Sequence, residues 1–100
     1  MTEHFNGLTP AEAERLAMLA EECAEVIQIV AKIQRHGYEG FHPDDPSTTN
    51  RTLLKKELVD LAAVENEMMD VGDVRFTLPG EILQSWQKKL RYSHHQEMML

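Results

Sequence analysis

The residues of this sequence best suited to chemistry are four acids that form two pairs, Glu22 with Glu25 and Glu57 with Asp60. The members of each pair are three positions apart, so on a helix they lie on neighbouring parts of one face. Two such helices side by side would direct four carboxylates into one small volume, where they would repel one another and resist desolvation. A hard divalent cation takes oxygen ligands of this kind. We therefore predict a Mg2+ site, with Mn2+ as an alternative ion, inside a helical bundle.

The first of the two helices must begin near Thr9, because Thr9-Pro10 followed by Glu12 is typical of a capping box with proline at the first helical position. It runs to about Gln34, and Gly37 is expected to end it. Apolar residues at alternating spacings of three and four predict a seam along a neighbouring helix. They are Leu16, Leu19, Cys23, Val26, Val30 and Ile33. Cys23 is interpreted as a small core residue of this seam. Because Ile27 and Ile29 widen the apolar band, this helix is expected to pack against more than one neighbour.

The second helix is predicted from residues 47–50 to about Asp70, after a loop at 37–47 that is rich in Gly, Pro and Asp. Its apolar positions are Leu53, Leu54, Leu58, Leu61, Val64 and Met68. At about 100° per residue, Glu57 falls in the middle of this apolar band and Asp60 at its edge. An ionised carboxylate in a core-facing position needs a partner. The position of Glu57 is thus the strongest single indication of a cation site.

The remaining segments complete a single domain over residues 1–100. Residues 1–8 are interpreted as a leader, 9–70 as the helical hairpin of the metal site, and 71–80 as a connector. A C-terminal helix is predicted over 81–97, with a buried stripe of Ile82, Leu83, Trp86 and Leu90. No convincing strand pattern is present. The fold class is all-α, with about three main helices per chain.

Composition excludes several classes of function. A net charge of −7 argues against a nucleic-acid-binding surface, which needs a basic footprint. No apolar run is long enough to span a bilayer, and the first residues lack the basic head and apolar stretch of a signal peptide. A single cysteine permits no intrachain disulfide. The sequence therefore predicts a cytoplasmic protein without a membrane or nucleic-acid partner.

The acidic pattern resembles that of the MazG-like all-α NTP pyrophosphatases. Glu-Glu-Cys-Ala-Glu at 21–25 matches the family's Glu-Glu-x-x-Glu, and Glu-Leu-Val-Asp at 57–60 matches its Glu-x-x-Asp on the next helix. Arg-His-Gly at 35–37, Thr-Asn-Arg at 49–51 and the basic tail look most like small phage-type members. The resemblance covers residues 16–69 well and the last helix more weakly.

The resemblance implies Mg2+-dependent hydrolysis of a nucleoside triphosphate between the α and β phosphates, giving the monophosphate and pyrophosphate. Glu22, Glu25, Glu57 and Asp60 would hold the cation, and Glu21 would orient the attacking water or bind a second ion. It also implies a four-helix-type core completed by dimerisation, in a homodimer or a tetramer.

Residues that would bind the substrate are less well defined. The candidates for binding the substrate are Lys32, Asn50, Arg51, Lys55, Lys88, Lys89 and Arg91. The lysines and arginines would bind the phosphates, and Asn50 would read the edge of the base. Candidates for stacking a base or reading its edge are Phe41, Trp86, Tyr92 and Asn66. No spacing selects among them, so the preferred base and sugar stay open.

Two other readings compete with this enzyme. A di-iron carboxylate bundle also gathers acids between helices, but it uses Glu-x-x-His pairs, which this sequence lacks. The alternative that stays open is a non-catalytic helical dimerisation or interaction module that keeps the fold without turnover.

Overall fold

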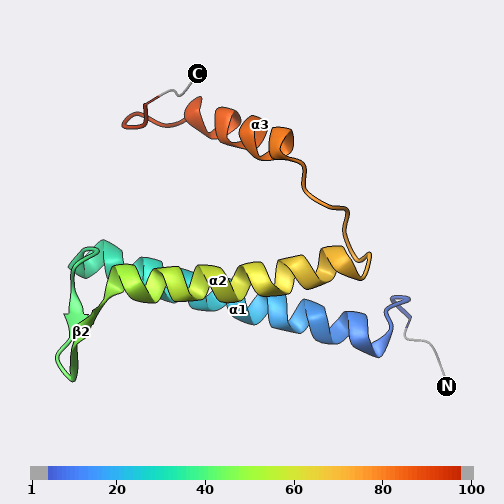
Figure 1. Cartoon of the computed structure of the whole chain (residues 1–100), viewed down its shortest axis with the longest axis horizontal. Helices are drawn as coiled ribbons and strands as arrows, with labels where there is room; N and C mark the ends of the chain where they lie inside the picture. Colours follow the sequence, from blue (N-terminus) through green and yellow to red (C-terminus); the bar gives the residue numbers. More distant parts are fainter. Residues whose placement is uncertain (1–4, 98–100) are drawn as a thin grey trace.

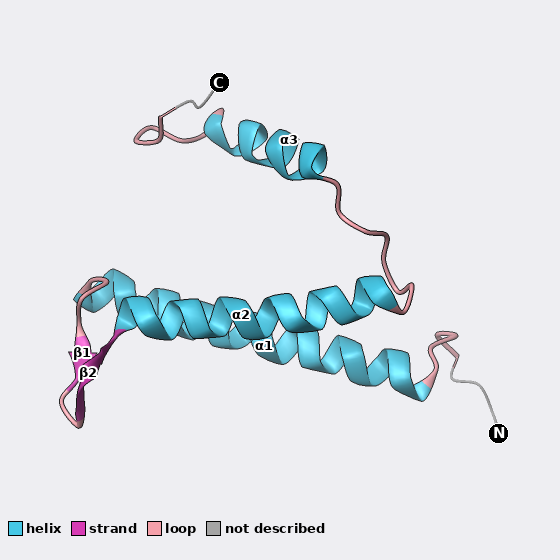
Figure 2. Cartoon of the chain, viewed as in Figure 1, coloured by secondary structure: helices cyan, strands magenta, loops and turns pink. Residues whose placement is uncertain are grey.

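The computed structural model describes residues 5–97, which are mostly helical. The elements follow in the order α1 (Pro10–His36), β1 (Phe41–His42), β2 (Asp45–Thr49), α2 (Asn50–Asp70) and α3 (Pro79–Leu90). Figures 1 and 2 show α1 and α2 lying alongside each other, with α3 held apart from both. The prediction of an all-α fold with three main helices is confirmed. Of the predicted leader, residues 1–4 lie outside the described part. None of the helices within 5–97 has both the length and the apolar character that crossing a membrane requires.

Both ends of α1 follow the predicted signals. The Thr9 hydroxyl accepts a hydrogen bond from the Glu12 backbone N–H at 3.1 Å, and the Glu12 carboxylate accepts one from the Thr9 N–H at 2.8 Å. This reciprocal capping box satisfies two N–H groups that have no partner inside the helix. At the other end Gly37 adopts φ 81° and donates its N–H to the Ile33 carbonyl at 2.7 Å. Because such a φ strains any residue with a Cβ, glycine is the residue that fits here.

The segment between α1 and α2 contains a small antiparallel β-hairpin, so the prediction of no strand is wrong here. β1 pairs with β2 in the register Phe41 with Thr49 and His42 with Asp45, with an irregularity between the two pairs. The strands are too short for an alternating pattern to show, and Pro46 within β2 argues against a strand. Pro46 is tolerated because each strand of a two-stranded sheet has a free edge. Thr49 then caps α2 through a hydrogen bond from the Thr52 N–H.

The core lies between α1 and α2, and among the described apolar residues only Ile29 and Met68 are buried, each with 5% of its surface exposed. The predicted seam is partly right. On α1, Leu19, Val26 and Ile33 are half-buried as predicted, whereas Leu16, Cys23 and Val30 are exposed. On α2 the apolar residues of the predicted band are buried or half-buried except Leu58, which is 44% exposed. The face of α1 that meets α2 is therefore rotated toward Glu22 and Ile29, and Cys23 is not a core residue of this chain.

The residues left out of the α1–α2 contact form an apolar row of their own, which we call the second row of α1. Its members follow one another at spacings of four, three, four and three, and all are exposed. They are Leu16, Ala20, Cys23, Ile27 and Val30. This spacing is that of a helix packed along a second helical neighbour, and no described element of this chain covers the row.

A largely buried ion pair joins the segment that follows α2 to α1. Arg15 donates two hydrogen bonds to the Asp73 carboxylate, at 2.6 and 3.0 Å, and both side chains are largely buried. The contact holds the start of the connector against α1, where Gly72 with φ 85° turns the chain.

α3 does not pack along α1 or α2 (Figure 1), which corrects the prediction that its apolar stripe is buried in this chain. Ile82, Leu83 and Trp86 are all exposed, and only Leu90 is half-buried. The helix also ends at Leu90 and not at residue 97. The radius of gyration is 17.6 Å, against about 13 Å for a compact chain of this length. A single copy is thus open, with its apolar stripe on α3 unpartnered.

Candidate metal centre

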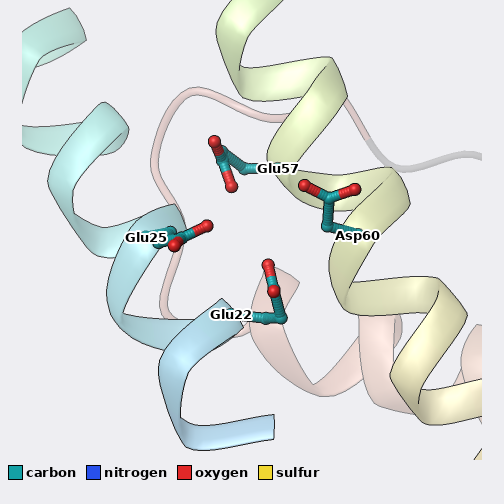
Figure 3. A group of neighbouring side chains, drawn as sticks. All are labelled: Glu22, Glu25, Glu57 and Asp60. Atoms are coloured by element: carbon teal, nitrogen blue, oxygen red, sulfur yellow. The ribbon is translucent and has the colours of Figure 1, made fainter. Parts of the chain in front are cut away.

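Four carboxylates from α1 and α2 converge where the two helices meet. Each of Glu22, Glu25, Glu57 and Asp60 offers one oxygen, and these oxygens all lie within 4.8 Å of one another. Figure 3 shows the four side chains pointing toward a common centre from the two helices. The convergence follows from the sequence, because each pair occupies adjacent turns on the inward face of its helix. The prediction that these acids come together is confirmed, and they do so within a single chain.

The environment of the acids does not provide enough hydrogen-bond donors for ionised carboxylates. One oxygen of Glu22 and one of Glu57 are buried, and neither has a hydrogen-bond partner among the described residues. The Glu57 side chain is only 16% exposed, whereas that of Asp60 is 41% exposed. Leaving a charged oxygen buried without a donor is costly. A cation between the helices would remove that cost, so the two orphaned oxygens fit a divalent ion.

The crowding also changes the acidity of Glu25. A hydrogen bond shared with Glu57, repulsion from the Glu22 carboxylate and partial burial together raise the pKa of Glu25 to about 7. Without a bound cation, Glu25 therefore holds a proton at pH values below about 7. Binding of a metal ion would displace this proton.

Lys56 supplies a positive charge to this cluster that the sequence analysis missed. Its Nζ atom lies 3.6 Å from Glu57 Oε1 and 3.4 Å from Asp60 Oδ2. The carboxylates raise the pKa of Lys56, with Glu57 making the largest contribution. The four-residue spacing from Lys56 to Asp60 is a signal that could have identified this contact. The lysine is 65% exposed, so it flanks the acids without filling the space between them.

A pocket of about 360 Å3 opens beside the cluster, and Glu25 and Glu57 form one end of it. The volume is within the range of small-molecule sites. Most of its lining residues are polar or charged. They are Glu25, Gln28, Ile29, Lys32, Lys56, Leu53 and Glu57. Of the cations predicted to bind phosphate, Lys32 lines this pocket.

Asn50 and Arg51 are engaged in holding the interhelical segment together. Asn50 is 5% exposed, and its amide donates a hydrogen bond to the Gly37 carbonyl at 3.2 Å. The Arg51 guanidinium lies 4.3 Å from the centre of the Tyr38 ring and bonds Glu39 at 2.8 Å. The structure gives both residues a scaffolding role, and neither lines the pocket beside the acids.

The other predicted residues lie away from the four acids. Glu21 is exposed and is not one of the converging group, although its charge contributes to the raised pKa of Glu25. Lys55 is exposed on α2 outside the pocket, and Lys88 belongs to the separate helix α3. The remaining candidates do not line the pocket beside the acids, although Trp86 and Lys89 line a separate pocket of about 370 Å3 on α3. These remaining candidates are Lys89, Arg91, Phe41, Asn66, Trp86 and Tyr92.

The donor set is all carboxylate oxygen, which suits Mg2+ or Mn2+ better than a softer metal. Such a centre can hold a cation and, through it, the oxygens of a phosphorylated ligand. The resemblance to MazG-like proteins stays a prediction made from the acidic motif. Comparison of the chain with protein-family models, with curated proteins and with solved structures found no match.

Proposed function

We propose that this protein is a Mg2+-dependent nucleoside triphosphate pyrophosphohydrolase that cleaves between the α and β phosphates. The observation that carries the proposal is the convergence of Glu22, Glu25, Glu57 and Asp60, two of which have buried oxygens without donors. The resemblance of the acidic motif supplies the reaction class. The pocket that begins at Glu25 and Glu57 offers space for a ligand next to the cation.

The reaction adds one water to the phosphoanhydride. A new bond forms between the water oxygen and phosphorus, the bridging P–O bond breaks, and the products are a nucleoside monophosphate and pyrophosphate. The bound cation would neutralise phosphate charge and lower the pKa of the attacking water. The four acids hold the cation, and with Mg2+ bound Glu25 is expected to be ionised. Glu21, one helical position away from the group, remains the candidate for orienting the water.

We also propose that the protein works as a homodimer, or as a tetramer formed by two such dimers. Support comes from two surfaces that the described chain leaves uncovered, the second row of α1 and the stripe of α3 formed by Ile82, Leu83 and Trp86. A helix of 12 residues is marginal alone in water and gains its stability from packing. A second copy would cover these surfaces and complete a four-helix-type core.

As part of this proposal, the single cysteine, which permits no intrachain disulfide, favours a cytoplasmic location. A nucleotide substrate with Mg2+ is also consistent with that compartment. Localisation of a C-terminally tagged protein by fractionation would test it.

The test of the activity is a substrate panel. Purified protein is incubated with each of the common NTPs and dNTPs in Mg2+, and both pyrophosphate and monophosphate are measured. We expect equal amounts of the two products from at least one nucleotide, and none in EDTA. Release of inorganic phosphate in place of pyrophosphate would contradict the proposed position of cleavage.

The exposed apolar surfaces also favour a second candidate, a non-catalytic dimerisation or interaction module. The module requires no turnover and no cation. Absence of pyrophosphate from every nucleotide, together with absence of Mg2+ and Mn2+ binding by calorimetry, would favour it over the enzyme.

A further inference from the structure

The pocket beside the acids is elongated along α1 and α2, starting at Glu25 and Glu57. α1 and α2 run antiparallel, so a path from Glu25 toward the C-terminal end of α1 is also a path from Glu57 toward the N-terminal end of α2. The lining residues follow this path on both helices, through Gln28 to Lys32 on one wall and through Lys56 to Leu53 on the other. The pocket thus begins at the acids, beside Lys56, and continues away from them toward Lys32.

The charges along this path change sign. At one end Glu25 and Glu57 belong to the converging acids, Lys56 lies beside Glu57 at this end, and Lys32 lies further along the wall formed by α1. An anion next to a cation held by the acids would therefore meet positive charge as it extends along the pocket. A triphosphate has this requirement, because its negative charge is spread over the whole phosphate chain. An ammonium on a flexible stem is a common phosphate ligand.

Lys56 is placed to take part in two different interactions. Its ammonium lies 3.4 Å from Asp60 Oδ2 and 3.6 Å from Glu57 Oε1, both of which belong to the converging acids. A divalent cation between the acids would neutralise much of their charge and repel the ammonium, which weakens both ion pairs. The lysine lines the pocket and is 65% exposed, so it is free to turn toward an anion there.

We propose that Lys56, together with Lys32, forms a phosphate-positioning pair that binds the pyrophosphate part of the substrate. Lys56 exchanges its carboxylate partners for phosphate oxygens when the acids hold Mg2+. This inference deepens the proposed function and rests on it for the identity of the substrate. Lys56 therefore has opposite effects on the two ligands: its charge disfavours binding of the cation and favours binding of the anion.

The experiment measures two affinities by calorimetry in the full-length protein. The first is that of Mn2+ or Mg2+ without phosphate, and the second is that of inorganic pyrophosphate with the protein held in saturating Mg2+. The variants are Lys56→Gln, Lys56→Arg and Lys32→Gln. Arg75→Gln is the control, because it removes the same charge from an exposed residue of the connector outside the pocket.

We expect Lys56→Gln to weaken pyrophosphate binding by about tenfold while the cation binds more tightly than in the wild type. Lys56→Arg should retain most of the pyrophosphate affinity, Lys32→Gln should weaken it, and Arg75→Gln should change neither affinity by more than about twofold. A merely structural role for Lys56 would not move the two affinities in opposite directions. Unchanged pyrophosphate binding in Lys56→Gln, or no pyrophosphate binding by the Mg2+-loaded wild type, would overturn the inference.

An assay of nucleotide hydrolysis separates this inference from the proposed function. If the wild type releases pyrophosphate from a nucleotide and Lys56→Gln keeps the wild-type KM and kcat, the inference fails and the proposed function stands. If the Mg2+-loaded wild type binds pyrophosphate through Lys56 but hydrolyses no nucleotide, the phosphate-positioning pair stands and the proposed activity fails. A nucleotide with a methylene group between the α and β phosphorus atoms provides the matching probe of intact substrate. Its affinity should fall in Lys56→Gln in parallel with that of pyrophosphate.

Discussion

Glu22 on α1 and Glu57 on α2 each keep one carboxylate oxygen buried without a hydrogen-bond donor, in a group whose ligand oxygens lie within 4.8 Å of one another. Native structures pair nearly all buried polar atoms, so each exception calls for a physical reason. A shared cation provides one for both oxygens at once. The two residues come from segments 35 positions apart in the sequence, and the α1–α2 hairpin brings them together.

Mg2+ or Mn2+ should raise the melting temperature of the protein, because the ion binds the folded acids and not the unfolded chain. At a concentration one hundred times its dissociation constant, a ligand adds about 2.7 kcal/mol of stability. Differential scanning fluorimetry with increasing metal, and with EDTA, measures the shift. A melting temperature that does not respond to either would contradict a preformed cation site.

Glu57→Gln should remove both this stabilisation and the release of pyrophosphate, because it deletes a ligand at the centre of the group. The metal-free variant should be at least as stable as the metal-free wild type, since a buried charge is lost from a repelling cluster. Glu65→Gln is the matched control, because Glu65 is exposed on the same helix and outside the group. Circular dichroism should show similar helical content in both variants. Normal turnover by Glu57→Gln would rule out the assigned site.

The metal-free protein should become less stable as the pH rises from about 5 to about 8. The pKa of Glu25 is raised to about 7, above its ordinary value of 4.5, so the folded state holds the proton more tightly than the unfolded state. This contribution to stability is present in full below the unfolded pKa and is lost as the pH rises through about 7. Melting temperatures in EDTA across this range test the prediction. Glu25→Gln should flatten the profile, whereas Glu14→Gln, which alters an exposed acid of the same helix, should keep it.

Asp73→Asn should lower the melting temperature at pH 7, because it breaks the two hydrogen bonds from Arg15 that hold the connector against α1. The Arg15 guanidinium lowers the pKa of Asp73 below its ordinary 3.8. The stabilisation is therefore present above that value and is lost as the pH falls through the lowered pKa. The difference between variant and wild type should shrink accordingly in acid. Asp70→Asn, at an exposed acid at the end of α2, should show no such difference.

The protein should have the mass of at least two chains in light scattering after size exclusion, and Ile27→Asp or Trp86→Asp should lower it. Each substitution places a charge on an uncovered apolar surface, which disfavours burial against a second copy. Ala17→Asp is the control on α1, since Ala17 is exposed and lies about a quarter turn from the second row. Gln87→Asp serves the same purpose on α3. A wild type of single-chain mass would contradict the proposed dimer.

The sequence by itself determined the all-α class, both ends of α1 and the pairing of the four acids. Those features depend on local chemistry, namely the capping box at Thr9, the glycine at Gly37 and the three-residue spacing of each acidic pair, which acts within one or two turns. The placement of Glu57 within an apolar band was enough to predict an inward-facing carboxylate.

Only the tertiary structure decided which apolar residues of α1 meet α2. Leu16, Cys23 and Val30 share the period of Leu19, Val26 and Ile33, and a hydrophobic pattern does not say which of two neighbouring rows a given helix covers. The role of Lys56 likewise depends on a pocket formed by both helices. The sequence of one helix shows that a charged residue is on its surface, but not which residues of the packed neighbouring helix lie opposite it.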